Sequence, residues 1–583
     1  MPDAPAPSRA AALLYALLLL HAWLYFSPAP RLHQPSAAYL EAALPPRLLL
    51  PPRSVEELVA LTEGGWAPCA TGNTSRVRVE WPPGAAAPLP SGARPLALGA
   101  RHVLLVTALT ATGARVRCGG DYLEAQLQGE HVRYRPRTED RLDGTYTLSI
   151  DLPNDPLLAG PAWLNLTLLF VHFAGMTEPS PALWRALAPH AAVFSAALQL
   201  VASAGAAPLR LPSCRAVPFM AEPFWSGHWV RLASAGAPCP EGLCQGSSAR
   251  LPQPWVYRLP QCSFELFSAA DARECVAGAW VLAAGDSCNP YSADSLFADV
   301  LRVRNHSSVP APLSERTFDI QVTAWEDESQ GSAPLPAPPP WLLRLTHIWL
   351  GGWDRTGNGA GLSLALDRDA LMTLFSHFLA WPGGSVLPDV YFINSGLHDG
   401  FTDYQEELRV TECHHAPPCP TYLTGRAHPG ATARFAAAVG AAVAFFRQLA
   451  ALPSDLAAGA RLAAGGAPGG APQPLPPPRQ PRFLWRHTVA TAGPRRATIY
   501  HNTQKMEVFA HIVAQRLLEE AQREPPAHWL FLDEFDMSFP WHYDLDASDH
   551  THYGLKDGRP LASVVDGMML HVALNGLCGP PSQ

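Results

Sequence analysis

Residues Ala279–Ser287 read AWVLAAGDS, an apolar run that ends in Gly285-Asp286-Ser287. Short apolar runs bounded by glycine are typical of buried β-strands, and the stretch that follows, Ser292–Val303, has a helical pattern. A serine between a strand and a helix lies in a turn where its hydroxyl is exposed and where free helix N–H groups can stabilise an oxyanion. This stretch therefore predicts an α/β fold with Ser287 as a candidate nucleophile.

After residue 213, strand patterns and helix patterns alternate along the chain. The alternation predicts a three-layer α/β domain over residues 214–583, with a mainly parallel sheet between helices. Two stretches rich in Pro and Gly, 332–341 and 453–481, are predicted to be disordered insertions. The expected strands are Phe318–Trp325, Leu342–Leu350, Asp389–Ile393, Arg482–Val489 and Trp529–Asp533, and the expected helices are Asp367–Leu379, Ala431–Leu452 and Gln504–Arg523.

Short alternating strands with turn signals between them fill residues 69–178. Strands at this spacing predict a β-sandwich of about a hundred residues, and the following residues, 179–213, are predicted to form a helical linker. The expected strands are Arg76–Trp81, His102–Thr110, Tyr122–Leu127, Thr145–Leu152 and Leu164–Phe173.

The N-terminal segment Ala10–Phe26, AAALLYALLLLHAWLYF, predicts a signal-anchor helix. Its bulky last residues, Trp23–Phe26, disfavour a cleaved signal peptide, although cleavage and secretion stay open as the alternative. We expect residues 1–9 to be a cytosolic tail and residues 27–68 a stem. The chain is then a single-pass type II protein of the Golgi or secretory-pathway membrane with a lumenal C-terminus.

Cysteines and sequons agree with that compartment. The chain has 11 cysteines, an odd number that leaves at least one unpaired if the others form disulfides. Three Asn-x-Ser/Thr triplets, at Asn73, Asn165 and Asn305, are candidate glycosylation sites. The net charge of −8 and the absence of a basic stripe exclude nucleic acid as an expected partner.

The segment Leu545–Gly554, LDASDHTHYG, offers a general base for Ser287. In a D-x-x-H arrangement the carboxylate can hold the ring Nδ1–H while Nε2 faces the serine. Asp549 and His552 have this spacing, which predicts a Ser287–His552–Asp549 triad. His550 competes for the role of base, and a solvated surface loop is the alternative without chemistry.

A third element, Asp389–Gly400, reads DVYFINSGLHDG and predicts a buried strand that ends in polar residues. The Asn394 amide and the Gly396 N–H, together with the Ser287 N–H, are candidate oxyanion-hole donors. A plain Gly-rich turn is the alternative interpretation, and Gly351-Gly352 could supply the glycine donor instead.

These elements together resemble the PC-esterase group of SGNH (GDSL-like) hydrolases, and within it the neurexophilin and PC-esterase (NXPE) family most closely. The match rests on the GDS turn, the I-N-S-G-x-H-D strand end, D-E-F-D-M-S and the final D-x-x-H-Y-G, framed by Cys262, Cys275 and Cys578. The segments GDYLEAQLQGE and DGTYTLSIDLP resemble filamin-type immunoglobulin repeats. Many relatives carry a basic residue about three positions after the GDS, where this chain has Cys288-Asn289-Pro290-Tyr291.

The resemblance implies acyl, typically acetyl, transfer to or removal from glycan hydroxyls. It implies no cofactor and no metal, with an acyl donor such as acetyl-CoA if the protein is a transferase, and a glycan or glycoprotein as partner. Three alternatives stay open: a catalytically silent carbohydrate- or protein-binding glycoprotein, a glycosyltransferase using Asp544-Leu545-Asp546, and a zinc site. The zinc ligands would come from Cys413, His414, His415 and Cys419, or from His542, His550 and His552.

Overall fold

The chain divides into two units, Met1–Leu49 and Leu50–Gln583, and every residue described below belongs to the second unit. The structure is a computed structural model. It describes residues 55–56, 71, 74–170, 192–206, 209–232, 254–303, 307–310, 318–322, 325, 342–349, 388–397, 431–450, 481–491, 503–523, 529–549, 551–554 and 563–578.

A seven-stranded sheet contains the strand that the AWVLAAG stretch predicts. Its five strands from β15 to β18 are parallel, and β13 and β14 join its edge in antiparallel pairing. Every strand expected in this half of the chain is present, with ends shifted by a few residues. The order is β13 (Ser307–Pro310), β14 (Phe318–Val322), β15 (Leu343–Trp349), β12 (Ala279–Gly285), β16 (Val390–Asn394), β17 (Arg482–Arg486) and β18 (Trp529–Leu532).

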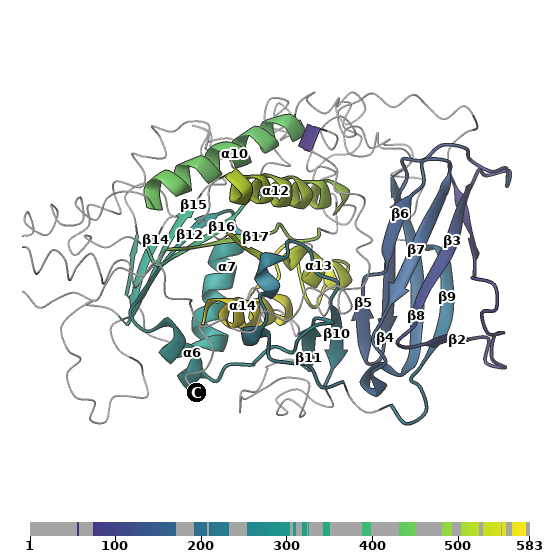
Figure 1. The fold of residues 1–583 in the computed structure, drawn as a ribbon, viewed down its shortest axis with the longest axis horizontal. Coiled ribbons are helices and arrows are strands. Elements are labelled where there is room, and N and C mark those ends of the chain that lie inside the picture. The colour runs from purple at the N-terminus through teal and green to yellow at the C-terminus, as the bar shows by residue number, and fades with distance from the viewer. Residues whose placement is uncertain are drawn as a thin grey trace, which may run out of the picture. The chain divides into compact units, whose positions relative to one another are not determined.

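Helices cover both faces of this sheet, which gives a layered α/β arrangement (Figure 1). Helices α10 (Ala431–Ala450) and α12 (Thr503–Arg523) lie on one face, and α7 (Cys288–Ser295) and α14 (Val564–Leu577) lie on the other. The predicted helices near 431–452 and 504–523 are confirmed, and the one at 367–379 lies outside the described residues. Shorter helices are α6 (Ala269–Val276), α13 (Glu534–Ser538), η1 (Pro156–Leu158), η2 (Cys214–Ala216), η3 (Phe219–Ala221), η4 (Leu296–Val300) and η11 (Phe539–Trp541).

Two further sheets form the N-terminal β region, and all five strands expected there are present. One sheet has the order β1 (Arg76–Glu80), β3 (Arg101–Leu109), β7 (Thr145–Asp151) and β6 (Arg137–Asp140). The other has the order β11 (Trp255–Arg258), β10 (His228–Arg231), β5 (Val132–Tyr134), β4 (Tyr122–Gly129), β8 (Gly160–Phe170), β9 (Ala192–Val201) and β2 (Arg94–Ala97). Both sheets contribute buried apolar residues to the core, such as Leu148 of β7 and Leu164 of β8, as when two sheets pack face to face. Burial alternates along β8, whereas β7 is buried at every position from Thr145 to Ile150.

The prediction of a helical linker over 179–213 was wrong where the structure describes it. Residues Ala192–Val201 form β9, which pairs antiparallel with β8 and parallel with β2. The segment is rich in Ala, which favours helix, but pairing on both edges outweighs that propensity. The sheet also extends past residue 213, because β10 pairs with β5. We refer to the two N-terminal sheets together as the β-sandwich.

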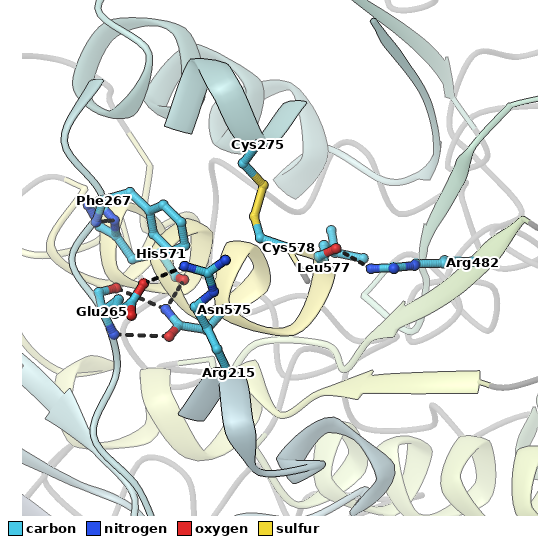
Figure 2. Close-up of a disulfide and its surroundings, with 9 residues drawn as sticks. All are labelled: Arg215, Glu265, Phe267, Cys275, Arg482, His571, Asn575, Leu577 and Cys578. Carbon is cyan, nitrogen blue, oxygen red and sulfur yellow. Dashed lines mark hydrogen bonds and ion pairs between the residues drawn. A yellow bond between two sulfur atoms is a disulfide. The ribbon is translucent and has the colours of Figure 1, made fainter. Parts of the chain in front are cut away.

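Two disulfides join described cysteines, Cys214 to Cys262 and Cys275 to Cys578. They are consistent with a secreted or lumenal protein. Cys288 is free and buried. Figure 2 shows the second disulfide, which ties the end of α14 to α6.

Hydrogen bonds beside this disulfide hold α14 in place (Figure 2). The Phe267 N–H donates to His571 Nδ1 at 3.1 Å, and the Asn575 side chain bonds both the N–H and the C=O of Glu265 at 2.9 Å. An ion pair of 2.9 Å joins Arg215 to Glu265. These contacts fix α14 against the chain that leads into β12.

Several predicted segments lie outside the described residues. They are the tail at 1–9, the anchor at 10–26, the stem at 27–68 apart from residues 55–56, the insertion at 332–341 and nearly all of the insertion at 453–481. Within the described part of the chain, no helix has the length and apolar character needed to cross a membrane.

Candidate active site

Ser287 lies in the turn between β12 and α7, the position that the sequence predicts. Two hydrogen bonds shape this turn: Asp286 N–H donates to Asn394 Oδ1 at 3.2 Å, and Cys288 N–H donates to Asp286 Oδ1 at 3.0 Å. A Cβ at Gly285 would lie 1.6 Å from Asn394 Oδ1. The turn therefore requires glycine at 285, because the neighbouring strand β16 approaches its backbone too closely for any side chain.

The D-x-x-H segment forms a tight loop in which one carboxylate organises the histidine. Asp549 Oδ1 accepts the N–H groups of Thr551 and His552 at 3.1 and 2.8 Å, and Oδ2 accepts His552 Nδ1–H at 2.9 Å. A carboxylate oxygen can only accept, so Nδ1 carries the proton and Nε2 is left as an acceptor. The loop thus sets the tautomer that a general base needs.

The structure brings Ser287 and His552 together although 265 positions separate them in the sequence. Ser287 Oγ lies 2.7 Å from His552 Nε2, within hydrogen-bond distance. The ring of Tyr291, from α7, lies 4.6 Å from the imidazole between centroids. The His552 and Asp549 side chains are 10% and 17% exposed, so the pair is partly shielded yet open to solvent. Ser287, His552 and Asp549 form a continuous hydrogen-bonded chain.

The structure places Asn394 beside the turn. Asn394 Nδ2 donates to Asp286 Oδ1 at 2.9 Å, and its Oδ1 accepts the Asp286 N–H, so two bonds fix the plane of this amide. An amide nitrogen has two hydrogens, and one remains after the bond to Asp286. Gly396 follows with φ +128°, a conformation that glycine adopts readily. His398, Asp399, Gly351 and Gly352 lie outside the described residues.

A buried charged cluster beneath the turn was not predicted. Arg486, at the end of β17, donates to Ser292 Oγ of α7 at 2.7 Å and to Glu534 Oε1 at 2.7 Å. Asp566 of α14 lies 3.6 Å from Arg486 and accepts the Ser292 hydroxyl at 2.7 Å. The cluster ties the helix after Ser287 to β17 and α14. In the sequence Arg486 only follows an apolar strand, so nothing there marks its partners.

Burial changes the acid–base properties of this cluster. Burial raises the pKa of Glu534 to about 8, Arg486 opposes that rise, and the Asp566 carboxylate adds to it. Burial likewise raises the pKa of the Cys288 thiol well above its usual range, and nearby Asp286 adds to the effect. A thiol held protonated is a weak nucleophile, which argues against Cys288 and leaves Ser287 as the candidate nucleophile of this turn.

The remaining candidate residues have other partners in the structure. The Asp544 carboxylate of the D-x-D triplet pairs with Arg133 at 2.8 Å, and His542 Nε2 lies 3.0 Å from a Glu124 carboxylate oxygen. Within the described residues no group of three His, Cys, Asp or Glu side chains could hold a metal ion. His550 and the segment Cys413–Cys419 lie outside those residues.

Of the three sequons, only Asn165 is described. It lies in β8, is partly exposed, and its Oδ1 accepts the Ser195 hydroxyl at 2.7 Å. That bond uses the amide oxygen and not the amide nitrogen, the atom that carries an N-linked glycan. Asn73 and Asn305 lie outside the described residues.

No protein-family model matches this chain, and no curated protein has significant sequence similarity to it. The functional argument therefore rests on the geometry of the Ser287–His552–Asp549 chain.

Proposed function

We propose that this protein is a serine-dependent acyl esterase or O-acyltransferase that acts on glycan hydroxyls in the lumen of the secretory pathway. The observation that carries the proposal is the 2.7 Å contact between Ser287 Oγ and His552 Nε2, with Asp549 at 2.9 Å behind the ring. We further propose an SGNH fold of the PC-esterase group, with NXPE as the closest family and a filamin-type immunoglobulin-like domain as the β-sandwich.

In the first half-reaction His552 Nε2 takes the Ser287 proton as Oγ attacks the acyl carbon. The oxyanion accepts hydrogen bonds from the Ser287 N–H and from the second hydrogen of Asn394 Nδ2, with Gly396 as the proposed third donor. The bond between the acyl carbon and the donor's oxygen or sulfur then breaks, and the leaving group takes the proton from His552. This leaves an ester of Ser287.

In the second half-reaction water or a sugar hydroxyl gives its proton to His552 and attacks the ester carbon. Ser287 Oγ leaves and recovers the proton from His552. Asp549 stays ionised throughout and stabilises the imidazolium that forms in each half. Water as acceptor makes the protein an esterase, and a glycan hydroxyl makes it a transferase supplied by a donor such as acetyl-CoA.

The test uses purified lumenal protein, a chromogenic acetyl ester and a fluorophosphonate probe that labels activated serines. Ser287→Ala should abolish labelling and turnover, and His552→Gln should lower both by about a hundredfold or more. Ser195→Ala, an exposed serine of β9, is the control and should match the wild type. Wild-type activity that survives Ser287→Ala would refute the proposal.

A catalytically silent binding protein is the second candidate. It is favoured by the region after the serine, where residues 288–291 carry no cation and Tyr291 packs against the His552 ring. If neither the wild type nor Ser287→Ala reacts with ester or probe, while both are folded and bind immobilised glycans, this candidate replaces the first.

A further inference from the structure

Hydrogen bonds from the β-sandwich and from the loop of Trp225 hold the chain between β18 and His552. This carrier segment, Asp533–Asp544, contains α13 and η11 and ends five positions before Asp549. Its contacts come from β6, β11, β10 and the loop that precedes β10. They are Arg137 to Asp536 at 2.6 Å, Tyr257 OH to Asp536 at 2.8 Å, Trp229 Nε1 to the Met537 carbonyl at 2.9 Å, and Trp225 N–H to Asp533 at 2.6 Å.

Arg133 of β5 makes the contact nearest to the histidine loop. Its Nη2 lies 2.8 Å from Asp544 Oδ2, and its guanidinium carbon lies 3.8 Å from the centre of the Trp541 ring. The other Asp544 oxygen, Oδ1, accepts the Asp546 N–H at 3.1 Å. The Asp544 carbonyl accepts the N–H groups of Ala547 and Ser548 at 3.1 and 3.0 Å. One side chain thus connects the β-sandwich to the turn that leads directly into Asp549.

A second contact is buried completely. Glu124 of β4 accepts His542 Nε2–H at 3.0 Å and the Tyr543 hydroxyl at 2.6 Å, and the Glu124 and His542 side chains are 0% exposed. Burying a carboxylate is costly unless hydrogen bonds or charges compensate it. These bonds therefore favour a single arrangement of the carrier segment over alternatives that leave Glu124 without partners.

We propose that the β-sandwich contributes to the active site: Arg133 and Glu124 are positioning residues that hold the loop of Asp549 and His552 within hydrogen-bond distance of Ser287. The inference rests on the proposed function. Its physical basis is that a general base must stay within a few tenths of an ångström of its working position, which loops achieve only when neighbouring packing and hydrogen bonds restrain them. Here the restraint comes from a region that is separate in sequence from the α/β sheet.

The test compares two ion pairs of the same kind. Arg133→Gln removes the pair with Asp544, whose side chains are 18% and 21% exposed, and Arg215→Gln removes the pair with Glu265, whose side chains are 15% and 16% exposed. Both variants should stay folded by circular dichroism. Arg133→Gln should slow fluorophosphonate labelling of Ser287 at least tenfold, and Arg215→Gln should change it less than twofold.

Arg133→Lys separates positioning from general stability. Lysine keeps the charge that faces Asp544 but loses the planar stacking on Trp541, so labelling should recover to within about threefold of the wild type. Hydrogen exchange supplies a readout that needs no chemistry: amides of 545–554 should exchange at least tenfold faster in Arg133→Gln and be unchanged in Arg215→Gln. Equal labelling and equal exchange in both Gln variants would overturn the inference.

The two proposals fail in different ways. If wild-type Ser287 is never labelled, the proposed function fails and hydrogen exchange alone decides whether the β-sandwich restrains the loop. If the wild type is labelled and Arg133→Gln is labelled and exchanges like it, the function stands and the positioning role of the β-sandwich is wrong.

Discussion

The two carboxylate oxygens of Asp549 have different roles. Oδ1 accepts a hydrogen bond from the loop backbone, and Oδ2 accepts one from the ring of His552. An asparagine at position 549 would still make the first hydrogen bond, because its side chain keeps one carbonyl oxygen. It would lose the second, because an amide nitrogen facing Nδ1 favours the tautomer with its proton on Nε2. That proton would block acceptance from Ser287.

Asp549→Asn should therefore lower the rate of ester hydrolysis by about 10²- to 10⁴-fold with little change in stability. The rate and the thermal unfolding temperature are measured side by side. Asp546→Asn, in the exposed part of the same loop, is the matched control. An Asp549→Asn rate within threefold of the wild type would show that the carboxylate does not set the tautomer.

Gly285→Ala tests the close approach of β16 to the nucleophile turn. The added Cβ meets Asn394 Oδ1 at 1.6 Å, so either the strand or the amide must move. We expect a loss of about 1–3 kcal/mol in the free energy of unfolding and loss of serine labelling. Gly440→Ala in α10 has no atom within 4 Å of its new Cβ and should be neutral or stabilising by up to about 1 kcal/mol.

At this scale the sequence is informative where partners are close in the chain. The spacing of Asp549 and His552 lets one loop build their contact, and a serine at a strand end is visible as a pattern. The bonds of Asn394 to Asp286 and of Arg486 to Ser292 and Glu534 depend on strand order and helix placement. No local pattern encodes those, which is why the buried cluster was missed.

Helices and strands were likewise predicted where the local pattern is clear and missed where tertiary contacts decide. Helix α12 has apolar residues three and four positions apart, such as Met506, Phe509, Val513 and Leu517, and it was predicted. Helix α14 was not predicted, because its residues Val564–Asn575 are all buried and show no apolar stripe. Strand β9 was predicted as a helix because its Ala-rich composition favours helix. Composition does not show that both edges of this segment pair with other strands. In both cases tertiary burial decides the structure.

Three buried histidines, one of them in α14, predict a loss of stability in acid. Burial lowers the pKa of His571 to about 4, and its Nδ1 accepts the Phe267 N–H, a bond that protonation of that nitrogen breaks. Burial also lowers the pKa of His228 to about 3, and it lowers that of His511 to about 4 while Glu507 opposes the drop. The unfolded chain takes up these protons near pH 6.5, so folding stability is lost as the pH falls from about 6.5 towards 4.

His571→Gln should make the loss of unfolding temperature between pH 6.5 and pH 4.5 smaller than in the wild type, whatever its stability at pH 7. Thermal unfolding at four or five pH values measures the slope. His131→Gln replaces an exposed histidine, 43% accessible, and is the control. If the His571→Gln slope equals that of the wild type, burial of this ring does not drive the acid sensitivity.

For the whole molecule, the contacts that cross from the β-sandwich to the carrier segment predict cooperative unfolding. Tyr122 and Arg135 of the β-sandwich also bond Glu507 of α12 at 2.8 and 2.5 Å. Separating the two parts would leave these groups without partners, so neither should melt alone.

Scanning calorimetry of the purified protein should therefore give one transition for the β-sandwich and the α/β sheet. Glu507→Gln, which weakens the pairing with Arg135, should broaden or split it, and Glu519→Gln, on a more exposed part of α12, should not. Two well-separated transitions in the wild type would show that the parts are thermodynamically independent.

The link between Cys275 and Cys578 has a consequence for biosynthesis. Because 303 positions separate the two cysteines, Cys275 must stay a thiol until Cys578 has been translated. A product that ends at Leu577 would never supply the partner, and its half-buried Cys275 would be available to other thiols in an oxidising compartment. Nonsense or frameshift changes just before Cys578 should thus yield covalently cross-linked chains, even though every residue of the Ser287 site has been translated.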